Sequence, residues 1–296
     1  MSQFNYTVTS EDKGMSIKIL LGKKFSFSTR LRNKIKREKL VFVNGEQLVT
    51  YLIPNPGDVI TVNLPEESSN FTPEDIPVSI VYEDEGLLIV DKQPGLVVHP
   101  TKGHPCHTLA NGIMKYMLDN GDNYKIRFIN RLDMDTSGIV LVAKNSHGQA
   151  SFMKQNQENK VKKIYIAVVT GIIAENEGTI DCPIGQPDPD SVRRGVVEGG
   201  SPSITHYTVL KRYDSGYTLV ELGLETGRTH QIRVHLSHIG YPIVGDHLYG
   251  QSNAFLIERQ ALHAKSISLS HPVTGLPLAA EAPLPEDILK LIEKIK

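Results

Sequence analysis

The chain has little of what secreted and membrane proteins need. Its 296 residues include two cysteines, Cys106 and Cys182, which are too few and too far apart to staple the fold with disulfides. It contains no run of about eighteen apolar residues that could span a membrane. Its first twenty residues mix Glu11, Asp12 and Lys13 and lack the apolar stretch of a signal peptide. We therefore expect a cytoplasmic protein with reduced thiols and no membrane partner.

Net charge is also nearly absent, because the formal charge at pH 7 is −1. This average hides one strongly basic segment. Residues 13–39 carry ten lysines and arginines against one acid, Glu38, which gives the segment +9 and leaves −10 for the rest of the chain. Isoleucine, leucine and phenylalanine alternate with these bases, so the segment should fold. A compact basic module attracts phosphates, which points to a nucleic acid as partner.

A small N-terminal module, residues 1–64, contains this basic segment. We expect a short strand near its start, from Met15, and then a basic helix over 28–39. Residues 41–45 predict a strand that runs into a tight turn, and a second turn precedes an alternating strand over 59–62.

This order of elements resembles the S4-like RNA-binding domain, in which a pair of helices presents basic side chains to RNA. The resemblance implies that Lys34, Lys36 and Arg37 bind RNA phosphates. The alternative is a structural cap that never touches RNA. Residues 65–77 are polar and bounded by prolines, which predicts a linker behind the module.

The rest of the chain, residues 78–296, predicts one larger catalytic domain of the α+β class. Helical patterns occur at 109–118 and 148–159, and an amphipathic helix runs from Pro285 to the end. Strands outnumber helices and do not alternate strictly with them, which favours a mixed, mainly antiparallel sheet with flanking helices over a Rossmann-type sheet. The runs that predict strands are 79–82, 87–91, 138–143, 163–169, 206–213, 217–224 and 261–269.

The sharpest local motif is R-L-D-M-D-T-S-G at 131–138, directly before an apolar strand. A calcium-binding EF-hand loop would need a glutamate where Lys144 stands, so calcium is excluded. An aspartyl-phosphate phosphotransferase places its acids after a strand and needs further acids for magnesium, and none follows closely behind Asp246. The remaining alternative is a turn in which Asp133 or Asp135 caps backbone amides.

Four further blocks accompany this motif in a fixed order. They are DKQPGLVVHP at 91–100, KIYIAVVTG at 163–171, TGRTHQIRVH at 226–235 and LHA at 262–264. Together with the motif they closely resemble the large-subunit ribosomal RNA pseudouridine synthases of the RluA/RluD type, whose catalytic motif is R-L-D-x-x-T-S/T-G. Any one block would be weak evidence, but five in order at compatible spacing are strong. A basic S4-like module in front is the usual layout of that family.

The resemblance implies an isomerase that converts uridine to pseudouridine in structured RNA without a cofactor or a metal ion. It makes Asp133 the catalytic aspartate, Tyr165 the tyrosine against the uracil ring, and Arg233 the partner of the catalytic carboxylate. A single carboxylate, as nucleophile or as base on the sugar, suffices for this chemistry. Arg131 is implied to fill the gap when the target nucleotide is flipped out of the stack. Asn130 departs from the family, which usually has histidine there.

Other polar residues carry weaker signals. Arg228, in a Thr-Gly-Arg turn, is a candidate contact to RNA phosphate. His230 and His235 do not have the four-residue spacing of a zinc-binding H-E-x-x-H pair, so we expect them to shape a strand that carries Arg233. The histidines and cysteine within 99–107 lack the regular pairs of a structural zinc site, which favours a loop near the pocket.

From the family layout we expect a monomer that acts on ribosomal RNA, with transfer RNA as the alternative substrate. Two functions of other classes stay open. A non-catalytic RNA-binding factor that kept the fold would have no need of Asp133, Tyr165 and Arg233, and a metal-dependent phosphohydrolase would lose its activity without metal. The residues alone decide neither which uridine is modified nor whether Asp133 acts as nucleophile or as base.

Overall fold

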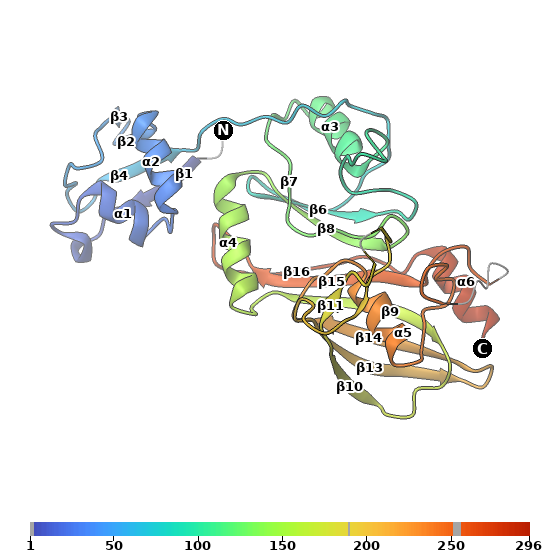
Figure 1. Cartoon of the computed structure of the whole chain (residues 1–296). Coiled ribbons are helices and arrows are strands. Elements are labelled where there is room, and N and C mark those ends of the chain that lie inside the picture. The colour runs from blue at the N-terminus through green and yellow to red at the C-terminus, as the bar shows by residue number, and fades with distance from the viewer. Residues whose placement is uncertain (1–2, 189, 251–255) are drawn as a thin grey trace.

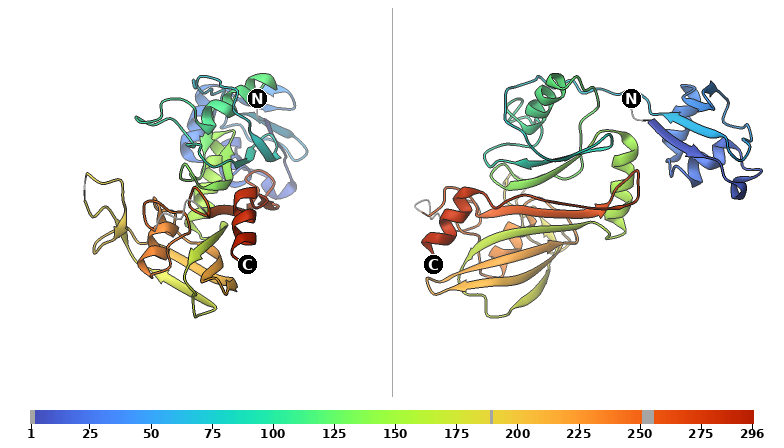
Figure 2. Two further views of the ribbon diagram at one scale, coloured as in Figure 1. Left: turned by 90° about the vertical axis from the view of Figure 1, so that its right-hand side faces the viewer. Right: turned by 180° about the vertical axis from the view of Figure 1, so that it is seen from behind.

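The structure, a computed structural model, describes residues 3–188, 190–250 and 256–296. It has two parts, a small N-terminal unit and a larger C-terminal domain, which one extended segment joins (Figure 1). The N-terminal unit projects to one side of the larger domain (Figure 2).

The N-terminal unit is a four-stranded antiparallel sheet, in the order β1-β4-β2-β3, with two helices packed on it. Helix α2 begins after Ser28, whose hydroxyl accepts from Leu31 N at 3.3 Å. The helix buries Leu31 and Ile35 and leaves most of its basic side chains toward solvent. The elements are β1 (Gln3–Thr7), η1 (Ser10–Asp12), α1 (Ile17–Lys23), α2 (Thr29–Arg37), β2 (Val41–Val43), β3 (Glu46–Gln47) and β4 (Val59–Asn63).

The short strand expected near Met15 is wrong, because residues 17–23 form helix α1. Ile17, Leu20 and Leu21 recur with helical spacing and all three are buried, so the apolar face of a helix accounts for them better than a strand does. The unit begins with strand β1, which the sequence analysis did not predict.

The larger domain contains a ten-stranded sheet. Its main order is β10-β13-β14-β9-β15-β8-β6-β5, with β16 beside β15 and β7 beside β8. In the described ranges every pairing in this sheet is antiparallel except that of β15 with β8. The predicted α+β class with a mixed, mainly antiparallel sheet is therefore confirmed.

Seven of these strands follow the predicted runs closely, whereas β7, β10 and β16 were not predicted, and three of the flanking helices lie near the predicted positions. The strands are β5 (Ser79–Glu83), β6 (Leu87–Lys92), β7 (Arg127–Phe128), β8 (Ser137–Ala143), β9 (Lys162–Thr170), β10 (Glu177–Asp181), β13 (Ile204–Tyr213), β14 (Tyr217–Leu224), β15 (Leu262–Ser270) and β16 (Pro277–Glu281). The helices are α3 (Leu109–Asp119), α4 (Ser146–Gln157), α5 (Gln231–His238) and α6 (Glu286–Lys294). A separate two-stranded ribbon is formed by β11 (Ile184–Gly185) and β12 (Gly195–Val196).

The parallel pairing of β8 with β15 requires a glycine. Gly138 has a φ of 109°, and a Cβ atom there would lie 2.2 Å from the carbonyl oxygen of Ala264. No other residue type fits so close an approach of two backbones. The start of β8 therefore lies against β15, which in turn pairs with β9. This brings the loop before β8 close to β9, although β8 and α4 separate the two in the chain.

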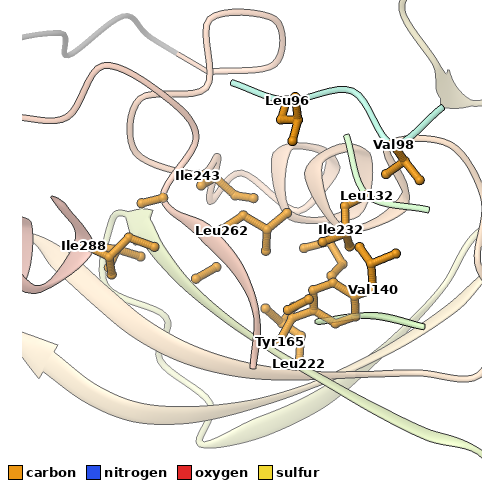
Figure 3. Close-up of a cluster of buried hydrophobic side chains, with 14 of the residues drawn as sticks. Leu96, Val98, Leu132, Val140, Tyr165, Leu222, Ile232, Ile243, Leu262 and Ile288 are labelled. Carbon is orange, nitrogen blue, oxygen red and sulfur yellow. The ribbon is translucent and has the colours of Figure 1, made fainter. Parts of the chain in front are cut away.

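A buried apolar cluster fills the space between these strands and α5 (Figure 3). Leu132 reaches it from the loop before β8, Ile232 from α5 and Leu262 from β15. Each of these side chains is at most 9% exposed. The residues next to the motif's aspartate are thus anchored in the core.

The segment over 65–77 is bound to the larger domain. Its Glu67 forms an ion pair with Arg127 and also lies 3.5 Å from Lys34 of α2. Asn111 of α3 donates a side-chain hydrogen bond to a backbone carbonyl of the segment at 2.8 Å. The segment therefore runs along a fixed path.

An aromatic cluster makes a second contact between the two parts. The ring of His147, at the start of α4, packs edge to face on Phe27 and Phe4 at centroid distances of 5.0 and 5.3 Å. Its Nε2 lies 3.1 Å from the carbonyl oxygen of Pro272, so this nitrogen carries the proton. Burial lowers the pKa of His147, which favours the neutral ring in this apolar contact.

Candidate active site

Asp133 lies in the loop between β7 and β8. Its carbonyl accepts from Thr136 N at 3.1 Å, which closes a turn, and the neighbouring Leu132 and Thr136 are buried. The side chain itself is 25% exposed. The Asp133 carboxylate is thus partly exposed, whereas the neighbouring residues of the loop are packed in the interior.

Arg233, on α5, lies between two carboxylates. Its Nη1 donates to Asp133 Oδ2 at 3.0 Å. On its other side Nε and Nη2 donate to the two oxygens of Asp246 at 2.7 and 2.9 Å, and Asp246 has no exposed side-chain surface. Burial alone would lower the pKa of Arg233, but the two carboxylates raise it above its usual value. The guanidinium is a permanent, oriented cation beside Asp133.

Arg233 and His235 lie on a helix, not on the strand that the sequence analysis predicts. Residues 231–238 form α5, and His230 before it has a left-handed backbone with a φ of 59°. The Gln231 side chain holds this corner, because its Oε1 accepts from a backbone amide of the preceding turn at 3.0 Å. Isoleucine and valine in so short a stretch mimic a strand pattern, and contacts distant in sequence decide for the helix.

His230 places a second basic group near Asp133. Its Nε2 lies 3.8 Å from Asp133 Oδ2, and its Nδ1 lies 2.8 Å from the Tyr249 hydroxyl. That hydroxyl accepts from Arg194 N at 2.7 Å, so its own proton can point at Nδ1 and leave the ring proton on Nε2, toward Asp133. Burial lowers the pKa of His230 below its usual value, although the Asp133 charge acts in the opposite direction.

Tyr165 lies on β9, and its ring belongs to the apolar cluster beside Leu222 and Ile232 (Figure 3). The residue is 8% exposed. Burial and then the charge of Asp133 raise the pKa of the Tyr165 hydroxyl. At neutral pH the Tyr165 hydroxyl keeps its proton. It can therefore take up a proton from another group only if it releases its own proton at the same time.

Two cavities of about 270 and 60 Å³ adjoin at Asp133. Arg131, Asp133, His230 and Arg233 line both of them, and Tyr165 lines the smaller one. Cavities of about 660 and 690 Å³ elsewhere in the described chain have none of these residues in their walls. The structure therefore brings Asp133, Tyr165 and Arg233 to one place, although they are up to a hundred residues apart in the sequence.

The predicted RNA-contacting residues fall into two groups. Arg131 and Arg228 are exposed. Arg131 lines both cavities at Asp133, whereas Arg228 lines the smaller one and donates from Nε to Pro202 O at 3.2 Å. The other group, on α2 in the N-terminal unit, lies outside the site. Its members are Lys34, which is held near Glu67, and the exposed Lys36 and Arg37.

The sequence reasoning missed two residues that hold the site. Asp246 was considered only as a second acid for a metal ion. In the structure it accepts two hydrogen bonds from the Arg233 guanidinium, on the side away from Asp133. Lys92 has no exposed surface and donates to the Met134 carbonyl at 2.8 Å, directly after Asp133 in the chain. In the sequence, both are charged residues within mainly apolar stretches. Such residues are often buried, and a buried charge is rarely left without a partner, so this pattern could have singled them out.

The histidine and cysteine cluster at 99–107 does not gather as a whole. Within the described chain, one group with metal-ligating side chains is found, in which ligand atoms of Glu74, Cys106 and His107 lie within 4.8 Å of one another. Cys106 and His107 are exposed, and His107 already forms an ion pair with Glu74. None of the three lines the cavities at Asp133.

A sequence model of the family described as RNA pseudouridylate synthase matches residues 86–238, which include Asp133, Tyr165 and Arg233. The chain belongs to this family. It is a pseudouridine synthase, an enzyme that isomerises uridine to pseudouridine in RNA. The family and enzyme class predicted from the five blocks are confirmed.

Several relatives of the synthase are similar over nearly its whole length. An uncharacterised RNA pseudouridine synthase of Bacillus subtilis, YlyB, is 40% identical over all of this chain and 99% of its own. The ribosomal large subunit pseudouridine synthase D of Pseudomonas aeruginosa is 39% identical over 90% of this chain and 87% of its own. Among solved structures, human RNA pseudouridylate synthase domain containing 1 is 27% identical, with a TM-score of 0.57 over 74% of this chain and 94% of its own.

The helices of the synthase give no sign of a membrane span. Across the described ranges, none combines the length and the apolar character that crossing a bilayer requires.

Proposed function

We propose that the synthase modifies specific uridines of ribosomal RNA with Asp133 as its catalytic carboxylate and without a cofactor. The observation that carries this proposal is the chain of contacts from Asp246 through Arg233 to Asp133, which ends in a partly exposed carboxylate that lines a cavity. Relatives named as large ribosomal subunit synthases support the choice of RNA.

The reaction fits a site of this composition. The bond between C1′ and N1 breaks, the uracil turns, a bond between C1′ and C5 forms, and the C5 proton leaves while N1 gains one. No electrons are gained or lost overall. The Arg233 guanidinium donates to the Asp133 carboxylate at 3.0 Å and orients it, and the carboxylate then acts either as a nucleophile or as a base on the sugar. Tyr165 offers an apolar face for the uracil and a hydroxyl for proton exchange.

A uridine stacked in RNA cannot reach Asp133, so the target must leave the stack at a cost of a few kcal/mol. The exposed Arg131, which lines both cavities, is the side chain proposed to occupy the gap. We propose further that residues 1–64 form an S4-like RNA-binding domain, with 65–77 as its connection. Contacts from Lys34, Lys36 and Arg37 to phosphates would offset part of the flipping cost.

Pseudouridine mapping on total RNA tests the proposal. Cells that lack the protein are complemented with the wild type, with Asp133→Asn, or with Asp119→Asn as a matched change at an exposed site. We expect a few ribosomal uridines to lose modification and to regain it with the wild type and the control but not with Asp133→Asn. Restoration by Asp133→Asn would refute the catalytic role, and changes confined to transfer RNA would refute the substrate.

A further inference from the structure

Two basic side chains donate hydrogen bonds to the backbone of the Asp133 loop. The carbonyl of Met134 accepts from Lys92 Nζ at 2.8 Å, and the next carbonyl, that of Asp135, accepts from Arg259 Nη1 at 2.9 Å. These carbonyls belong to the two residues that follow Asp133 in the chain.

Arg259 connects this loop with the start of β15. The residue is 6% exposed, and its Nη1 also lies 3.3 Å from the carbonyl of Leu262 while its Nη2 lies 3.3 Å from Ser137 Oγ. Its backbone approaches Gly245 so closely that a Cβ atom there would lie 2.2 Å from the Arg259 carbonyl oxygen. One guanidinium therefore reaches both ends of the segment that leads from Asp135 into β8.

The orientation of this guanidinium depends on the C-terminal helix. Asp287, in the first turn of α6, binds Arg259 in bidentate fashion, with Nε to Oδ2 at 2.6 Å and Nη2 to Oδ1 at 2.9 Å. The helix is fixed to the core through Ile288 and Leu291, neither of which has exposed surface. A bidentate pair sets both the position and the plane of an arginine, which a single contact does not.

We infer that Asp287 is a positioning residue for catalysis, which acts through Arg259 on the backbone of the Asp133 loop. This inference rests on the proposed role of Asp133. Asp287 does not line the cavities at Asp133, and in the described part of the chain Arg259 is the side chain that links it to the Asp133 loop. Without its carboxylate the guanidinium loses its fixed plane, the Asp135 carbonyl loses its donor, and Asp133 is no longer held against Arg233.

The test compares Asp287→Asn with Glu286→Gln in the full-length enzyme. Glu286 is the neighbouring acid of α6 and pairs with Lys290 at 2.7 Å, so its loss controls for a removed charge on the same helix. Single-turnover rates with excess enzyme and dissociation constants for the same RNA are measured separately. We expect the rate of Asp287→Asn to fall about ten- to a hundredfold, since small misplacements of catalytic groups cost that much. RNA affinity and the Glu286→Gln rate should stay within about twofold of wild type.

Two further variants separate positioning from simple stabilisation. Asp287→Glu keeps the charge and should recover part of the rate, whereas Arg259→Lys keeps a cation without the planar fork and should lose rate like Asp287→Asn. Circular dichroism gives the folded fraction of each variant. The inference is wrong if Asp287→Asn retains the wild-type rate, or if its rate loss only matches the unfolded fraction. An active Asp133→Asn, assayed alongside, would instead overturn the catalytic role of Asp133 itself.

Discussion

Replacing Asp246 by asparagine tests whether Arg233, the cation beside the proposed catalytic carboxylate, needs its second carboxylate partner. The substitution keeps the shape of the side chain and one acceptor oxygen. It removes the negative charge and turns an NH₂ group toward the guanidinium of Arg233, which has no acceptor to offer. Arg233 then has Asp133 as its one remaining carboxylate among the described contacts.

The size of the effect follows from the burial of the pair. Asp246 has no exposed side-chain surface and Arg233 is 9% exposed, so water cannot replace the lost partner. Removing one member of a buried pair costs about 3–5 kcal/mol, and the retained oxygen of asparagine places the expected loss of unfolding free energy at the lower end, about 3 kcal/mol. An Arg233 free to shift by about 1 Å should lower the single-turnover rate about a hundredfold.

Release of tritium from RNA labelled at uridine C5 measures the rate, because that hydrogen leaves during the isomerisation. Urea unfolding measures stability, and Asp119→Asn, which breaks an exposed pair with Lys115, serves as control. The reasoning fails if Asp246→Asn, assayed where it is fully folded, reacts within twofold of the wild type. A loss of stability without a loss of rate would leave Asp246 as a structural residue only.

Three other perturbations have defined outcomes. Burial lowers the pKa of His263 to about 4 from an unfolded value of about 6.5, so the stability from its neutral ring is complete above pH 6.5 and is lost as pH falls toward 4. Urea unfolding of His263→Gln from pH 7 to 4 should therefore lack about 3 kcal/mol of the wild-type acid destabilisation, and equal slopes would contradict this origin. Tyr165→Phe keeps the ring and should bind RNA normally while the single-turnover rate drops at least about a hundredfold, and an unchanged rate would exclude proton transfer through the hydroxyl. The pair Lys36→Ala and Arg37→Ala should weaken RNA binding and reduce the slope of log K against log salt by about 1.4–1.8, as expected for two lost phosphate contacts. An unchanged slope in a salt titration would show that α2 does not touch RNA.

Much of the fold could be predicted from the sequence, because the strands of the larger domain either alternate between apolar and polar residues or are continuously apolar, and clear turns separate them. The two helices that were predicted as strands, α1 and α5, have fewer than ten residues each. In segments so short, periodicity distinguishes a helix from a strand poorly, and tertiary contacts such as those of Gln231 decide.

The site shows a similar division. Asp133, Tyr165 and Arg233 could be named from sequence because they fall inside motifs, and the pairing of Asp133 with Arg233 is found at 3.0 Å. Asp246 and Asp287 could not be singled out, because each binds an arginine that lies elsewhere in the chain and the sequence around a carboxylate does not reveal its partner. Which acids support an active site follows from the packing of elements, not from spacing.

The path of residues 65–77 determines how far the N-terminal unit lies from the site at Asp133. A free tether of this length would let the N-terminal unit sample points up to about 40 Å away. The contacts of Glu67 with Arg127 and Lys34, and the packing of Phe27 on His147, instead set one distance between α2 and Asp133. With α2 in its proposed role, an RNA must offer phosphates at that distance from the target uridine in order to contact α2 and Asp133 together, so the tertiary shape of the RNA would contribute to the choice of target.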